Sequence, residues 1–358
     1  MATGTIHYWA AARAAAGIAE EAYDAATLAQ ALAAVRAAHG EELRRVLDRC
    51  SFIVDDNPVG TRSHDDVRLT DGGSIEVLPP FAGGSREPVA PTTLRASHIL
   101  LTGLGAAVVA AALAGLALVH IGLLAAGVFA VQVVLALAWL AAVDVPGGGG
   151  AFVIVVIASG VMDGLVATYN QADIGRAAGV AAVAVIVSLL HQLARRPRVD
   201  VTLSFGGTIA AVGFAMSAAS YLALAVQTDG ADADAVALLG AGVALGIARL
   251  SDLALPRPAA VPGSRRGVVG LVLGFAFALL VGYLFSTGYA SLEHGRGIRL
   301  ALVAAVIALV TDLAIDGVLR GAPPKDERAR SGVPPLGILL PVVLAAPAVY
   351  VAGRILLG

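Results

Sequence analysis

Residues 79–84 read Pro-Pro-Phe-Ala-Gly-Gly, and this is the stretch whose residue types point most directly to chemistry. Glycine has no Cβ atom, so an extended tail that ends in Gly83 and Gly84 can enter a narrow tunnel and reach the active site of a partner. The chain continues through Ser85, however, and a glycine pair can equally begin a flexible linker. The residues alone leave both interpretations open.

Ionisable side chains inside long apolar runs form a second candidate site. These residues are Asp163, His191, Asp252, Asp312 and Asp316. Asp312, Asp316 and Arg320 are spaced four residues apart, so they share one face of a helix. Arg249 and Asp252 are three residues apart, a spacing that allows them to pair. Polar residues within a membrane usually face a partner or a cavity, so ion pairing, a substrate site and an ion path all remain possible.

The composition places most of the chain in a membrane. The 358 residues are 58% hydrophobic and 14% charged, whereas a soluble domain has about 25% charged residues. The net charge of −2 argues against a general nucleic-acid binder. Cys50 is the only cysteine and cannot form an internal disulfide. Residues 1–20 contain no continuous apolar core of the signal-peptide type, so we expect the N-terminal part to stay in the cytosol.

Nine apolar segments are long enough to span a bilayer. They are residues 98–118, 121–143, 151–168, 178–194, 201–226, 234–250, 267–290, 298–319 and 334–356. Basic residues follow the fourth, sixth and eighth segments, which predicts that these loops and the N-terminus are cytosolic. The glycine run 147–150 lacks a following Lys-Ser/Thr pair and is interpreted as a loop.

The first 84 residues have the pattern of a small α+β domain. Strands are predicted at 5–9, 20–24, 52–54 and 74–78, with a further short strand between Val67 and Leu69. Residues 10–17 are interpreted as a small-residue connection. A helix is predicted from Thr27 to a C-cap at Gly40, with a second helical turn at 43–47. The order suits a ubiquitin-like β-grasp fold at 1–84, then a linker at 85–97 and an all-α polytopic membrane domain at 98–358.

Three stretches of this head resemble the MoaD/ThiS family of ubiquitin-like sulfur carriers. They are Ala-Arg-Ala-Ala-Ala-Gly at 12–17, Leu-Thr-Asp-Gly-Gly at 69–73 and the tail at 79–84. In that family the carboxylate of the last glycine is adenylated and then converted to a thiocarboxylate. The resemblance implies two partners for the head, an adenylating enzyme and a synthase for a sulfur-containing cofactor such as molybdopterin. It also implies cleavage after Gly84, because a carrier needs a free carboxylate.

A second resemblance concerns the membrane part. Residues 311–326 are similar to the phosphatidate cytidylyltransferase signature, with Asp312, Leu313, Arg320, Lys325 and Asp326 at the family spacing. Asp252, Arg265 and Arg266 resemble that family's earlier aspartate and basic pair. Asp316 joins these residues in the candidate polar site. The family's His-Gly-Gly and Asp-Arg-x-Asp motifs are missing, and the apolar residues 334–340 stand in their place.

That departure bears on cofactors, because carboxylates are needed to hold Mg²⁺ against the phosphates of a nucleotide. Mg²⁺ is therefore expected only if nucleotide chemistry is retained, and the sequence identifies no other cofactor and no metal site. The leading hypothesis is a membrane-tethered sulfur carrier for molybdopterin or thiamine synthesis. The alternatives are a degenerate, non-catalytic cytidylyltransferase relative with a docking head, and a transporter. The sequence favours a carrier or pseudoenzyme over an enzyme.

Overall fold

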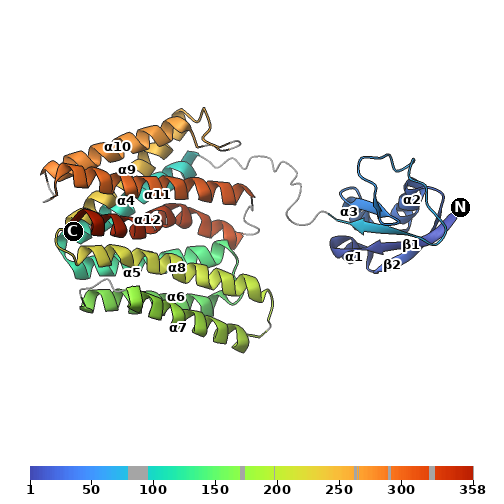
Figure 1. Cartoon of the computed structure of the whole chain (residues 1–358), viewed down its shortest axis with the longest axis horizontal. Helices are drawn as coiled ribbons and strands as arrows, with labels where there is room; N and C mark the ends of the chain where they lie inside the picture. The colour runs from blue at the N-terminus through green and yellow to red at the C-terminus, as the bar shows by residue number, and fades with distance from the viewer. Residues whose placement is uncertain are drawn as a thin grey trace. The chain divides into compact units, whose positions relative to one another are not determined.

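A computed structural model describes residues 1–79, 96–169, 174–196, 198–261, 264, 266–288, 292–321 and 327–357. The chain divides into two compact units, Met1–Thr93 and Leu94–Gly358. The first unit holds a β-sheet with short helices, and the second is entirely helical in its described part (Figure 1). The two units are described in turn.

The first unit is built on a five-stranded mixed sheet with strand order β2-β1-β5-β3-β4. The strands are β1 (Ala2–Tyr8), β2 (Glu20–Ala25), β3 (Ser51–Val54), β4 (Asn57–Pro58) and β5 (Gly73–Leu78). The first strand pairs parallel to β5 and antiparallel to β2, and β3 pairs antiparallel to both β4 and β5. The last strand of the unit therefore lies in the middle of the sheet, which is the β-grasp arrangement.

Three helices accompany the sheet, namely α1 (Ala10–Ala16), α2 (Leu28–Ala38) and α3 (Glu41–Leu47). The second helix begins where the Thr27 hydroxyl accepts a hydrogen bond from the Gln30 backbone N–H, an ordinary N-cap. Alternate strand residues such as Ile6, Tyr8, Ile75 and Val77 face the helices, because side chains alternate across a strand. They form one core with the helical residues Leu28, Ala31, Leu32, Val35, Leu43 and Leu47.

Two local predictions for the head were wrong. Residues 10–16 form a helix and not an irregular connection, because alanine is the strongest helix former and Gly17 ends the helix with a φ of 74°. No strand forms between Val67 and Leu69 in this described part, where Arg68 makes only an isolated bridge to Thr27. After β3 the chain turns at Asp55 and Asp56, and Asn57 and Pro58 return antiparallel as β4.

The second unit contains nine helices in its described residues. They are α4 (Ala96–Val119), α5 (Ile121–Ala142), α6 (Gly148–Tyr169), α7 (Ile174–Ala194), α8 (Val201–Ala225), α9 (Gly230–Ala254), α10 (Val268–Gly288), α11 (His294–Gly321) and α12 (Glu327–Leu357). Each is long and apolar enough to cross a membrane. The chain is thus a β-grasp-like head followed by an all-helical region that fits a multi-pass membrane protein.

The helices run side by side, with α10 at one edge of the unit and α7 at the opposite edge (Figure 1). The most buried of the nine is α9, which packs against α4, α10 and α11. Small residues make these contacts close: a Cβ atom on Gly240 would lie 2.7 Å from the Cβ of Ala301, and one on Gly274 would lie 2.7 Å from the carbonyl oxygen of Ala244. Close packing of small residues is what associates helices in lipid.

Several helices in this unit extend beyond the predicted segments, and two of these differences are informative. The glycine run predicted as a loop contributes Gly148, Gly149 and Gly150 to the first turn of α6. The ring of His191 lies against Gly150, where a Cβ atom would be 2.7 Å from its Nδ1, so a larger residue there would displace the imidazole. The last helix begins at Glu327, ahead of the predicted start at residue 334, and continues through four prolines.

Candidate functional site

The candidate carrier tail follows the best-anchored strand of the head. Ile75 and Val77 of β5 are fully buried, and the Val77 carbonyl accepts a 3.2 Å hydrogen bond from the Trp9 backbone N–H. The Trp9 indole also donates to the Glu76 carboxylate. Pro79, the first residue of the 79–84 tail, is described, whereas Gly83 and Gly84 lie outside the described residues. The sheet thus fixes the base from which residues 80–84 begin.

The turn before β5 is held by carboxylate hydrogen bonds. Asp55 accepts from the Thr70 hydroxyl at 2.6 Å and from the Ser74 backbone N–H at 2.8 Å. Asp71 accepts from the Thr3 backbone N–H at 2.9 Å. Gly72 has a φ of 72°, which favours glycine. The stretch 69–73, which resembles the carriers, therefore has a structural role: it fixes the register of β5 against β1 and β3.

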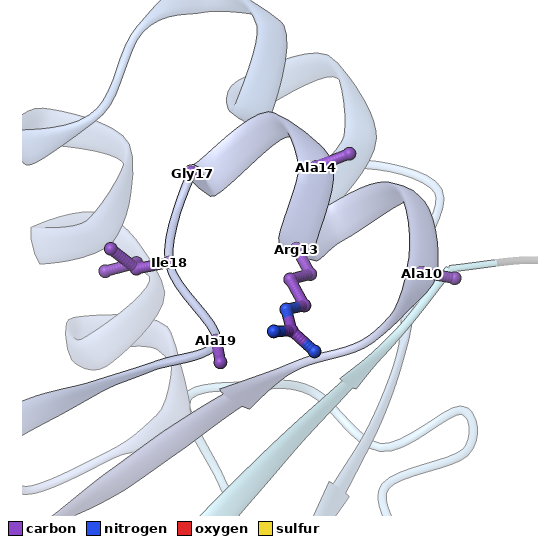
Figure 2. Close-up of a pocket in the computed structure, with 6 residues that line it drawn as sticks. All are labelled: Ala10, Arg13, Ala14, Gly17, Ile18 and Ala19. Carbon is purple, nitrogen blue, oxygen red and sulfur yellow. The ribbon is translucent and has the colours of Figure 1, made fainter.

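A shallow pocket lies beside α1 and is drawn in Figure 2. Its lining consists of Ala10, Arg13, Ala14, Gly17, Ile18 and Ala19. Figure 2 shows the Arg13 side chain extending from α1 toward Ala19. The lining includes no carboxylate, hydroxyl, thiol or imidazole group, so the pocket lacks a nucleophile and a general base.

The single thiol of the head is not poised for sulfur chemistry. Cys50 is partly buried, and its thiol lies 3.2 Å from the Val46 carbonyl oxygen, to which it donates. Burial raises the pKa of the Cys50 thiol to about 11. The reactive thiolate is therefore scarce at neutral pH. Any sulfur carried by the head has to be carried elsewhere than on this residue.

The candidate polar site of the helical unit centres on Arg249 of α9, which is nearly fully buried. Its guanidinium group donates to the Thr102 hydroxyl on α4 and to the Asp312 carboxylate on α11. It also lies 3.4 Å from the Gly337 carbonyl oxygen on α12. One arginine thereby connects four helices, three of them through its partners.

Arg266, just before α10, completes the cluster. It lies 3.4 Å from Asp252 and 3.1 Å from Asp312. The second oxygen of Asp252 accepts a 2.7 Å hydrogen bond from the Gly267 backbone N–H. Ser264 donates to Asp316 at 2.9 Å. The loop between α9 and α10 is therefore tied to α11 by charged hydrogen bonds.

The structure brings together Asp252, Arg266, Asp312 and Asp316 from the predicted set. The suggested pairing of Arg249 with Asp252 was wrong, because Arg249 contacts Asp312 and Asp252 contacts Arg266. Arg265, Lys325 and Asp326 lie outside the described residues, as does the side chain of Arg320. Sequence reasoning missed the contributions of Thr102, Ser264 and Gly337. The sequence signal was a hydroxyl group within an apolar helix for Thr102 and in the loop between α9 and α10 for Ser264, and Gly337 gave none.

The cluster has the character of an internal ion-pair network. Each carboxylate oxygen of Asp252 and Asp312 has a cationic or N–H partner within the cluster. Within the described residues, no three side chains of His, Cys, Asp or Glu are grouped so that they could hold a metal ion. The geometry thus supports a structural lock at this end of the helices, the end at which α4 begins.

The comparison with known families bears on the head. Residues 6–84 match the ThiS family. The matched segment runs from within β1 through the other strands, the helices of the head and the tail to Gly84, and ends before the helical unit. It lends no support to a cytidylyltransferase relationship in that unit. No match to a curated protein was found.

Proposed function

We propose that this protein is a membrane-anchored sulfur carrier whose Gly83-Gly84 tail is freed by cleavage after Gly84. The head is a ThiS-like, sulfur-carrier-type domain, and nine apolar helices follow it in the described part of the chain. The observation that carries the proposal is that the family match extends through Gly84, beyond the end of β5 at Leu78. The matched segment thus includes the two glycines on which carrier chemistry depends.

The proposed chemistry needs a free carboxylate at Gly84. Hydrolysis of the Gly84–Ser85 peptide bond supplies it, since an amide offers an activating enzyme no carboxylate to adenylate. The carboxylate then attacks the α-phosphate of ATP on an adenylating enzyme, which gives the acyl adenylate and releases pyrophosphate, and a sulfide-level sulfur donor displaces AMP to leave a thiocarboxylate. The sulfur passes to a synthase of molybdopterin or thiamine formation.

The proposed location of the head is the cytosol. Arg195, Arg196 and Arg198 lie at or after the end of α7, and basic residues also follow α9 and α11, whereas the turn between α8 and α9 carries Asp229 and no basic residue. A cytosolic head is accessible to soluble activating enzymes. The bilayer anchor would hold the carrier beside a membrane until it is released.

The deciding experiment is intact-mass analysis of head species isolated from native membranes. A fragment ending at Gly84 should be present, and a fraction of it should be heavier by the difference between sulfur and oxygen. Gly84→Trp should abolish the sulfur-bearing species, because a bulky side chain blocks entry of the tail into a tunnel. Gly40→Trp is the matched control, since Gly40 is exposed with open space around it.

A second function has one observation in its favour, namely that the chain continues through Ser85. In that case the head is a docking module on a membrane protein and its tail is a linker. Recovery of the head only as part of the full-length chain, together with normal cofactor synthesis in the Gly84→Trp strain, would support docking and exclude the carrier.

A further inference from the structure

Three polar side chains lie buried between α5 and α6, outside the cluster around Arg249. Gln132 and Ser159 are each 1% exposed, and Asp163 is 5% exposed. Gln132 is near the middle of α5, and Ser159 is near the middle of α6. The group therefore lies at the depth of the apolar core, and polar residues at that depth call for a functional explanation.

Two of the three side chains are joined directly by a hydrogen bond, and the third lies one helical turn from Asp163. The Gln132 amide donates to Oδ1 of Asp163 at 3.1 Å. Ser159 precedes Asp163 by four residues, so both occupy the same face of α6. Oε1 of Gln132, Oγ of Ser159 and Oδ2 of Asp163 have no hydrogen-bond partner within the described part of the chain. One polar atom from each residue is therefore left unsatisfied.

No charge faces this group from the described elements packed against it. Helices α5, α7 and α8 pack on α6, and α4, α8 and α12 pack on α5. The described part of α4 contains no Asp, Glu, Lys or Arg, and the charged residues of α12 lie near its two ends, at Glu327, Arg328, Arg330 and Arg354. Neither α5 nor α8 contains a charged residue, and Asp163 is the only charged residue within the bounds of α6. On α7, the guanidinium of Arg176 lies over the Tyr169 ring at one end of α6, and His191 lies against Gly150 at the other end. Asp163 has no cationic partner between them.

The contrast with the Arg249 cluster indicates what the group lacks. There each carboxylate oxygen of Asp252 and Asp312 has an arginine or N–H partner, whereas here three oxygen atoms have no hydrogen-bond partner among the described residues. A buried charge without a partner is costly, and a buried polar group without a hydrogen bond is also destabilising. The missing component is a small positive charge that also supplies a hydrogen-bond donor.

We propose that Gln132, Ser159 and Asp163 form an intramembrane proton-binding site, with Asp163 as the residue that takes up the proton. A proton from the aqueous phase adds to Oδ2 of the carboxylate, which becomes a neutral carboxyl group. The set then has three donor groups, the carboxyl, the hydroxyl and the amide, and each of the three residues also accepts. Proton uptake thus removes the uncompensated charge and supplies the missing donor.

The proposal assigns the helical unit a role beyond anchoring. Carboxyl groups that gain and lose protons inside a membrane are the elements through which membrane proteins respond to a proton gradient. The inference stands on α5 and α6 alone and does not depend on the carrier function of the head. Failure of one proposal leaves the other intact.

The test uses the purified full-length protein in detergent and a hydrophobic carbodiimide, which reacts with protonated carboxyl groups in apolar surroundings. Modified residues are located by peptide mass mapping from about pH 5 to about pH 9, a range in which a buried carboxyl can titrate. Asp163 should be modified, and above the midpoint its rate should fall about tenfold for each pH unit. Asp163→Asn should remove this modification and no other.

Two further variants separate a proton site from a merely reactive carboxyl. Gln132→Leu removes a hydrogen bond to the ionised form, so the pH midpoint of labelling should rise. Ser217→Ala is the control, since Ser217 is partly exposed and its hydroxyl bonds the Gly213 carbonyl; this variant should keep the wild-type midpoint. No labelling of Asp163 in folded protein, or labelling that is independent of pH, would overturn the proposal. Protection by Na⁺ but not by choline would also overturn it, in favour of a metal-cation site.

Discussion

At the scale of single residues, Arg249 is the side chain that connects the helices of the second unit at its polar cluster. It is buried among Thr102, Asp312 and Gly337, which come from three other helices. A buried ion pair contributes little net stability compared with apolar packing, but removing one partner leaves an uncompensated charge. The two arginines of the cluster therefore make its carboxylates far more sensitive to substitution than exposed acidic residues.

Asp312→Ala should lower the free energy of unfolding by about 3–5 kcal/mol, because it leaves Arg249 and Arg266 without their shared carboxylate. The measurement is unfolding of the full-length protein in mixed micelles. Glu293→Gln is the control, since the exposed Glu293–Arg296 pair should contribute less than about 1 kcal/mol. Equal effects of the two variants would contradict the assignment of a buried lock.

A second residue-scale prediction concerns Tyr8 in the head. Burial and the hydrogen bond to Glu21 raise the pKa of Tyr8 above its ordinary value of 10.0. Above that pH the unfolded chain loses the tyrosine proton first, so stability should fall as the pH rises from 10.0 toward the folded pKa. Urea unfolding of residues 1–84 at a series of pH values, monitored by Trp9 fluorescence, measures this loss of unfolding free energy.

Tyr8→Phe should unfold with a smaller alkaline loss than the wild-type head. It should keep part of the loss, because burial also raises the pKa values of Tyr23 and Cys50. If the free energy of unfolding of Tyr8→Phe fell with alkaline pH as steeply as that of the wild type, Tyr8 would ionise equally easily in the folded and unfolded states.

At the scale of elements, α12 shows how a proline-containing helix is accommodated. Pro341 has no N–H, so the carbonyl oxygen four residues earlier, that of Gly337, receives no intrahelical hydrogen bond. The guanidinium of Arg249 lies 3.4 Å from this same oxygen. The lock therefore also satisfies a carbonyl that the proline leaves free.

This arrangement predicts coupling between α9 and α12. Arg249→Met should be less destabilising, by about 1 kcal/mol, in a Pro341→Ala background, where the backbone N–H restored at position 341 can bond the Gly337 carbonyl. The four unfolding free energies of the double-mutant cycle give the coupling. Pro347→Ala is the matched control, because the carbonyl it leaves free, that of Val343, is not a partner of Arg249. A coupling of similar size with Pro347→Ala would argue for a general effect of helix flexibility.

At the scale of the whole molecule, the sequence was enough to predict a small mixed domain followed by nine apolar helices. The alternation of apolar and polar residues along the strands and the length of the apolar runs are local features of the sequence. Both correspond directly to elements of the folded structure. Helix α1 was not predicted, because Ala10–Ala16 is nearly all alanine and shows no apolar periodicity. The partners of Arg249 escaped because Thr102 and Gly337 are 147 and 88 residues away, and a single sequence does not encode such pairings visibly.

Orientation in the membrane is a prediction at this scale. In a Cys50→Ser background, Val199→Cys lies in the loop between α7 and α8, and Thr228→Cys lies in the turn between α8 and α9. Both positions are exposed. A membrane-impermeant maleimide applied to intact cells should label Thr228→Cys and leave Val199→Cys unlabelled. The reverse pattern would place the head outside the cytosol.

The central place of β5 has a mechanical consequence. The segment that joins the head to the helices leaves from the end of this strand, which is hydrogen-bonded on one side to β1 and on the other to β3. A pull exerted through that segment acts along the strand, so it loads both rows of hydrogen bonds in shear at once and cannot open them one at a time. The head is thereby built to resist tension applied at the end of the strand from which the joining segment leaves.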